Sequence, residues 1–336
     1  MCAVTDTTAT DETAAAFEPE LERHRAELTG HCYRMLGSAF EAEDAVQETL
    51  VRAWRGIDRF EGRAALRTWL YRIATNVCLD MLGSRQRRAR PMDLAGPSAA
   101  DSPLSQLPEV TWIEPVPDGR VLSADADPAE RAVERETIRL AFVAALQLLP
   151  PKQRAVLILR DVVRWQATEV AELLGTSDAS VNSALQRARS TLATRDVAAT
   201  VADAPAHMMD DTQRDLLERY VDAFERYDMD ALTSLLHQDA MQSMPPYEQW
   251  LQGRSEMVQF WVGPGAGCRG SRLVPVRANG RPAFGQYRPS TVRPGGHDPW
   301  SLQVVEIRDD RVQELTFFLD TARLFPLFGL PPRLDP

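Results

Sequence analysis

The sequence lacks several features that would place it in large classes of protein. None of its 336 residues belong to an apolar run that approaches the ~18 residues needed to cross a membrane. The N-terminus has neither the basic start nor the apolar stretch of a signal peptide. The four cysteines are scattered without CxxC or metal-ligand spacing, and Walker and Rossmann signatures are missing. We therefore expect a cytoplasmic protein that uses neither a metal nor a cofactor.

Lysine is nearly missing too, since Lys152 is the only one, and the arginines are concentrated in one block. Residues 52–90 hold ten arginines and three acids, a local charge of +7 in a chain whose net charge is −10. Trp54, Phe60, Trp69 and Tyr71 lie between these arginines. Guanidinium groups bind phosphates, and aromatic rings stack on unpaired bases. The block therefore predicts a nucleic-acid-binding surface, because a basic block in an acidic chain is unlikely to be incidental.

Two motifs in this part of the chain resemble a known family. FEGRAALRTWLYRIATNVCLD, followed by a basic tail, resembles the promoter-melting part of region 2 in bacterial sigma factors, above all the extracytoplasmic-function (ECF) group. DAVQE lies on an amphipathic helix and is similar to the sigma-factor helix that docks on the largest subunit of RNA polymerase. The resemblance implies that Asp44, Gln47 and Glu48 accept hydrogen bonds from arginines of the polymerase.

The helix expected over Leu66–Gly83 carries the predicted contacts to the −10 element. We expect its apolar stripe to consist of Leu70, Ile73, Val77 and Met81, with Asn76 at the border of the stripe. A hydrogen bond from this helix to a loop explains Asn76 equally well from the residues alone. The resemblance implies instead that Asn76 and Phe60 hold bases flipped from the stack. The full predicted −10 set is Phe60, Arg63, Arg67, Arg72, Asn76, Arg85, Arg87 and Arg88.

The segment 128–195 predicts four helices, of which the last two form a helix-turn-helix. The first is expected to run unbroken from Pro128 to the prolines at 150 and 151, and Gly175 marks the turn of the motif. In the last helix Val181, Leu185, Ala188 and Leu192 form the expected buried stripe. With the preceding block, this unit resembles sigma region 4, which reads the −35 element. The predicted −35 contacts are Asn182, Ser183, Gln186 and Arg187, which face outward, and Arg189, which lies on the flank.

Beyond residue 211 the pattern changes to two helices followed by strands. SLQVVEIRDDRVQELTFFLD predicts two strands joined at Asp309-Asp310, and FGQY predicts another. The order resembles the SnoaL-like branch of the NTF2-like cone fold, and the closing FLDTARLFPLFGLPP suggests the group typified by mycobacterial SigG. Relatives of this fold use an Asp or His as acid/base. The candidates are His237, Asp239, His297 and Asp298, in no spacing that defines a site. Trp250, Trp261 and Trp300 are candidates for a ligand pocket or for the core.

The predicted protein is multidomain, with two all-α sigma domains and an α+β cone. Its expected layout is a disordered N-terminus (1–16), region 2 (17–90), a flexible proline-rich linker (91–127), region 4 (128–195), a short linker (196–211), the SnoaL-like domain (212–325) and a C-terminal tail (326–336). The predicted function is that of a non-catalytic sigma factor whose partners are core RNA polymerase and promoter DNA. Whether a small ligand or an anti-sigma factor also binds stays open.

Two other functions compete with this prediction. A helix-turn-helix regulator with a ligand-sensing domain would explain the last two domains, but would leave DAVQE and FEGRAALRTWLYRIATN without a role. A SnoaL-like enzyme with a DNA-binding appendage would need a convergent acid/base pair, which the spacing does not supply.

Overall fold

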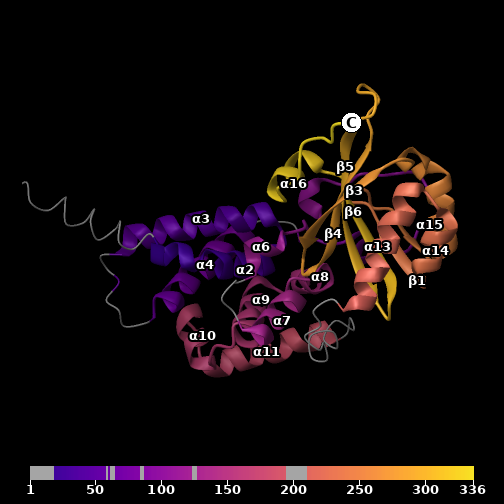
Figure 1. Ribbon diagram of the computed structural model, residues 1–336. Coiled ribbons are helices and arrows are strands. Elements are labelled where there is room, and N and C mark those ends of the chain that lie inside the picture. Colours follow the sequence, from indigo (N-terminus) through magenta and orange to yellow (C-terminus); the bar gives the residue numbers. More distant parts are fainter. Residues whose placement is uncertain (1–18, 58–59, 61–64, 84–86, 123–126, 194–209) are drawn as a thin grey trace, which may run out of the picture. The chain divides into compact units, whose positions relative to one another are not determined.

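The computed structural model describes residues 19–57, 60, 65–83, 87–122, 127–193 and 210–336 (Figure 1). It divides into two compact units. We call them the helical unit (within 1–87 and 119–204) and the sheet unit (88–118 and 205–336). The predicted disordered N-terminus and nearly all of the predicted 196–211 linker lie outside the described residues. Asp210, at the end of that linker, caps the first helix of the sheet unit by accepting from the backbone N of Gln213.

The first half of the helical unit is a bundle of three helices, which contain the predicted DAVQE and basic motifs. Gly37 ends the first helix in the left-handed region at φ 73°, and the Ser38 side chain caps the second by accepting from the backbone N of Glu41. The helices are α2 (Arg25–Leu36), α3 (Ala39–Gly56) and α4 (Leu66–Leu82).

The predicted apolar stripe of α4 is only partly right. Leu70 and Val77 are buried, but Ile73 and Met81 are half-buried, and the other buried residues are Tyr71, Ala74, Thr75 and Cys78. The buried face is displaced because α4 packs on α2 and α3 and also on α9 (Pro151–Leu157). A single apolar stripe is expected for a helix that packs on one side only. Helix α4 packs on α2 and α3 and also on α9, so its buried face is wider.

The second half of the helical unit contains the predicted helix-turn-helix. One expected helix is two, because the chain breaks at Ile138 and Arg139, and Arg139 is extended. At the break the Thr137 hydroxyl donates to the carbonyl of Val133 and accepts from Arg34. The elements here are α6 (Asp118–Val121), α7 (Pro128–Thr137), α8 (Leu140–Gln147), α9, the π-helical turn η3 (Ile158–Val162), α10 (Ala167–Leu174) and α11 (Asp178–Ala193).

The sheet unit is built on one six-stranded sheet with the order β2-β1-β6-β5-β4-β3. All neighbouring strands are antiparallel except β1 and β6, which are parallel. Asp309 and Asp310 join β5 to β6 as predicted, both at positive φ. The strands are β1 (Leu236–Ser243), β2 (Trp250–Gln252), β3 (Arg272–Ala278), β4 (Arg281–Pro289), β5 (His297–Arg308) and β6 (Arg311–Phe318).

Helices pack on this sheet and close an apolar core (Figure 1). Tyr220 lies in this core with its hydroxyl donating to Gln303 Oε1 at 2.9 Å, so a buried polar atom is satisfied by the sheet itself. The helices are α13 (Asp211–Arg226), α14 (Met229–Leu235), α15 (Arg254–Val262), the 3₁₀ turn η4 (Pro264–Cys268) and α16 (Thr321–Leu327).

Residues 88–118 fall largely in the region where the sequence predicts a flexible linker, yet they lie along the sheet unit. We call them the strap; it contains α5 (Pro91–Leu94) and the 3₁₀ turn η2 (Glu109–Thr111). Trp250 Nε1 donates to the carbonyl of Ala95 at 2.8 Å, and Val116 and Asn279 exchange two hydrogen bonds. The proline-rich composition of this segment does not predict hydrogen bonds to distant parts of the chain.

Candidate nucleic-acid interface

The exposed face of α11 carries all five predicted −35 contacts. Gly175 makes the turn at φ 61°, where a side chain would be strained, and the Ser177 hydroxyl accepts from the backbone N of Ser180 to start the helix. The four residues of the expected inner stripe are the buried ones of α11, which confirms the orientation of the helix. Outward and exposed are Asn182, Ser183, Gln186, Arg187 and Arg189.

The two arginines of this face differ in their partners. Arg189 forms a bidentate ion pair with Asp161, with Nε–Oδ2 at 2.9 Å and Nη2–Oδ1 at 2.6 Å. This hydrogen bond raises the pKa of Arg189 and holds its guanidinium against η3. Within the described residues the Arg187 guanidinium has no ion-pair partner. Arg187 is therefore the cation on α11 that is free to bind a phosphate or a base edge.

The predicted −10 residues are placed on or beside α4 where the structure describes them. Asn76 is exposed, and its amide has no hydrogen-bond partner within the described ranges. Phe60 is half-buried and its ring lies 5.0 Å from that of Trp69. Arg63 and Arg85 lie outside the described residues.

The cations of α4 are paired with acids of the helical unit. Arg72 Nη2 lies 2.7 Å from Glu172 Oε1, on the first helix of the helix-turn-helix, and Arg67 Nε lies 2.6 Å from Glu27 Oε2. The ring of Tyr71, next to Arg72, packs on Trp165 with centroids 5.5 Å apart. The Arg72 guanidinium is therefore paired with a carboxylate of the helix-turn-helix.

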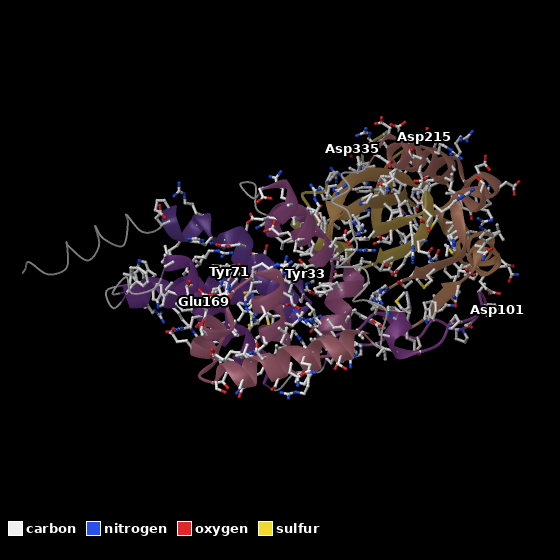
Figure 2. All side chains as sticks on the ribbon, turned by 90° about the horizontal axis from the view of Figure 1, so that it is seen from below. Tyr33, Tyr71, Asp101, Glu169, Asp215 and Asp335 are labelled. Carbon is white, nitrogen blue, oxygen red and sulfur yellow. The ribbon has the colours of Figure 1, made fainter. Side chains whose placement is uncertain are left out.

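Buried hydrogen bonds join the two halves of the helical unit. Figure 2 labels Tyr33 and Tyr71 in this unit. Arg34 on α2 donates to the Thr137 hydroxyl from Nε at 3.1 Å and Nη2 at 2.8 Å. Arg154 on α9 donates to the carbonyls of Met35 and Leu149. Burial, followed by the charge of Arg87, lowers the pKa of Arg154 to about 10. These guanidiniums connect α2 to α7 and α9.

Arg87 and Arg88, the last two predicted −10 residues, differ in exposure. Arg87 is exposed. Arg88 is 7% exposed and donates to the carbonyl of Trp112 at 2.6 Å, inside the sheet unit. In this arrangement the Arg88 side chain is buried within the strap and is not open to a nucleic acid. No feature of the sequence distinguishes it from the neighbouring arginines.

The predicted polymerase-binding residues share the outer face of α3. Asp44, Gln47 and Glu48 are exposed, while Ala45, Val46 and Thr49 are buried against the bundle. Glu48 Oε1 is 2.6 Å from Arg52 Nε on the next turn. Both side chains are about half exposed, so this pair contributes little to stability and leaves Glu48 able to exchange partners.

Comparison with known proteins shows the family of the chain. Residues 21–88 match Sigma-70 region 2, residues 139–192 match Sigma-70, region 4, and residues 217–315 match the SnoaL-like domain. Over 328 residues the chain is 48% identical to the ECF RNA polymerase sigma factor SigG of Mycobacterium tuberculosis, covering 96% of this chain and 86% of that protein. The chain belongs to the ECF RNA polymerase sigma factors.

A second relative supports the fold of the whole sigma factor. The ECF RNA polymerase sigma factor SigJ of Mycobacterium tuberculosis is 29% identical over 251 residues, covering 73% of this chain and 72% of that protein. The crystal structure of SigJ matches with a TM-score of 0.59 at 24% identity, over 96% of this chain and 99% of that one. The match shows that both chains share helical sigma regions and a C-terminal sheet domain.

The SnoaL-like domain of this sigma factor holds a cavity of about 190 Å³. Trp261 and Trp300 line it, whereas Trp250 binds the strap. His237, Asp239, His297 and Asp298 do not line it, and its described lining contains no carboxylate or imidazole. In the parts of the chain that the structure describes, no helix has the length and apolar character of a membrane span, and no three His, Cys, Asp or Glu side chains gather as a metal site would require.

Proposed function

We propose that this protein binds core RNA polymerase in the cytoplasm and directs it to promoters, without catalysis of its own. Its α11 face reads the −35 element through Asn182, Ser183, Gln186 and Arg187. Its α4 face holds the melted −10 element through Asn76, Phe60 and the nearby arginines. The observation that carries the proposal is that one chain exposes a helix-turn-helix face, Asn76 on α4 and an acidic face on α3. A helix-turn-helix regulator uses only the first of these.

The helical unit must open before both elements are read. The two elements are centred about 25 base pairs apart, or ~85 Å along B-form DNA. The Arg72–Glu172 pair holds the first helix of the helix-turn-helix directly on α4, at 2.7 Å. We infer that the described arrangement is a closed form, whose buried Arg34 and Arg154 hydrogen bonds are exchanged for contacts with polymerase and promoter.

The SnoaL-like domain is proposed to be regulatory, through the strap. The strap connects the two sigma regions, and it makes hydrogen bonds to the domain along most of its length. Removal of the whole domain would leave the strap without these partners. Point variants of the full chain therefore test the sigma function more cleanly than a truncation does.

Binding to core polymerase tests the proposed role of α3. We expect the charge reversals Asp44→Lys and Glu48→Lys together to weaken the affinity of the full chain for core polymerase at least about tenfold, because like charges would face the polymerase arginines. Fluorescence anisotropy of labelled full chain measures this. The control is Glu130→Lys, at an exposed position of α7 in the same unit. Equal affinities of the α3 variant and the control would contradict the assignment.

A further inference from the structure

The cavity of the sheet unit has a lining that is mainly apolar and rich in aromatic side chains. It lies between the α13–α15 helices and the sheet, with Phe224, Phe260, Trp261 and Phe317 in its wall. At about 190 Å³ it is somewhat larger than a 150 Å³ cavity that takes up benzene. A molecule of one or two rings therefore fits this space, and a drug-sized ligand does not.

Arg288 is the one charged residue in the described lining of this cavity. Its guanidinium carbon lies 3.1 Å from the ring centroid of Trp300, and its Nη2 donates to Cys268 Sγ at 2.9 Å. Its Nε is buried without a hydrogen-bond partner, and in the described residues no carboxylate pairs with it. On the same strand Arg281 is paired with Glu306 at 3.0 Å. Arg288 is half-buried, and its charge and remaining N–H donors suit an anionic partner.

We propose that the cavity binds a small aromatic carboxylate, with its rings among the aromatic side chains and its carboxylate on Arg288. This inference goes beyond the proposed sigma function and does not depend on it. The Trp300 ring covers one face of the guanidinium and limits its movement. The described lining contains no carboxylate or imidazole, and the proposal is one of binding.

The strap forms part of the cavity wall through Leu104. The segment that holds Leu104 is fixed to the domain by hydrogen bonds from Leu107 N to the carbonyl of Pro246 at 3.1 Å and from Glu248 N to the carbonyl of Ser105 at 3.0 Å. A bound ligand therefore touches the connection between the two sigma regions. Binding is expected to slow hydrogen exchange in residues 104–107, because only the strap-bound state has a complete site.

Isothermal titration calorimetry of the full chain with benzoate and 2-naphthoate tests the proposal. We expect one saturable site for at least one of them, and binding of 2-naphthamide about tenfold weaker than that of 2-naphthoate, because the amide lacks the charge. This comparison needs no variant. Absence of saturable binding for both acids, or equal binding of acid and amide, would overturn the proposal. Since neither polymerase nor DNA is present, that failure would leave the sigma function standing.

Two variants locate the bound molecule. Arg288→Gln is expected to weaken 2-naphthoate binding at least about tenfold while leaving 2-naphthamide binding unchanged. Leu232→Trp fills the cavity and is expected to abolish binding of both. The control is Arg272→Gln, a surface arginine of β3 paired with Glu225 and outside the cavity. Circular dichroism confirms folding of each variant. If Arg288→Gln, folded, binds the acid as tightly as the control does, the assigned site is wrong.

Discussion

His31 shows how one buried residue sets a pH response in the helical unit. It is fully buried, with Nε2 3.0 Å from the Thr75 hydroxyl, while Nδ1 has no partner in the described structure. Burial and then the charge of Arg34 lower the pKa of His31 to about 3. The unfolded chain binds a proton near pH 6.5 and the folded chain does not. The stabilisation is therefore complete above pH 6.5 and is lost as pH falls toward 3.

We expect the free energy of unfolding of the helical unit to fall by about 2 kcal/mol between pH 7.5 and 5.0 through this histidine alone. His31→Gln is uncharged at both pH values and should lose that share of the pH dependence. Urea unfolding at the two pH values, followed by circular dichroism, measures the difference. His237→Gln, in the sheet unit, is the control and should keep the wild-type slope. A wild-type slope in His31→Gln would refute the assignment.

Single residues also show which parts of the site the sequence reveals. The α11 face was predictable, because one stripe of apolar residues fixes which side of a helix is outward. The pairing of Arg72 with Glu172 was not, since the two residues are a hundred positions apart. The surroundings of Arg288 were not predictable either. Its neighbours Cys268 and Trp300 come from other elements, and no local pattern joins them.

At the scale of elements, hydrogen bonds hold the strap on the sheet unit, and the sequence of the strap does not predict them. Asn279 is fully buried at φ 55°, its side chain accepts from Val116 N at 3.1 Å, and its backbone N donates to the Val116 carbonyl at 3.0 Å. Gly280 N donates to Asp118 Oδ1 at 2.7 Å. The turn between β3 and β4 therefore supplies hydrogen-bond partners to the end of the strap, as a neighbouring strand would. Proline-rich composition predicts the lack of regular structure but not this attachment.

Asn279→Gly tests the attachment, because glycine keeps the backbone conformation and removes the side-chain acceptor. We expect it to destabilise the sheet unit by about 1–3 kcal/mol, the cost of a buried unsatisfied N–H, and to speed hydrogen exchange in residues 113–118. Asp309→Gly is matched, since Asp309 has a φ of 49° but is exposed, and should change stability by less than about 0.5 kcal/mol. Unchanged exchange at 113–118 in Asn279→Gly would show that the strap is held by other contacts.

The contact between α10 and α4 predicts a separate effect on DNA binding. The Arg72–Glu172 pair is largely exposed, so Glu172→Gln should change stability by less than about 1 kcal/mol. Because the variant frees Arg72, we expect affinity for random single-stranded DNA to rise about two- to fivefold. Fluorescence anisotropy of a labelled oligonucleotide measures it, with Glu130→Gln as control. Equal affinities for the two variants would mean that Glu172 does not shield the −10 face.

At the scale of the whole molecule, the sequence predicted the three modules. It did not predict how the two sigma regions pack on each other. Regions 2 and 4 and the SnoaL-like domain could be predicted from motifs, because each has a local sequence pattern that can be read without knowing the tertiary contacts. The buried Arg34 and Arg154 networks, which turn the two sigma regions into one closed unit, join residues more than a hundred positions apart. We infer a closed form of the sigma factor, in which the Arg72–Glu172 pair joins α4 to the helix-turn-helix and opening precedes the reading of promoter DNA.

Run-off transcription with purified core RNA polymerase and a promoter library tests the central claim most directly. We predict that the full chain starts transcripts at defined sites, and that Arg308→Ala, at an exposed arginine of the sheet unit, does the same. Arg187→Ala and Asn76→Ala should each reduce these transcripts at least about tenfold, through lost −35 and −10 contacts. If the full chain binds core polymerase but starts no transcripts at defined sites, or if both variants match Arg308→Ala, the account is wrong.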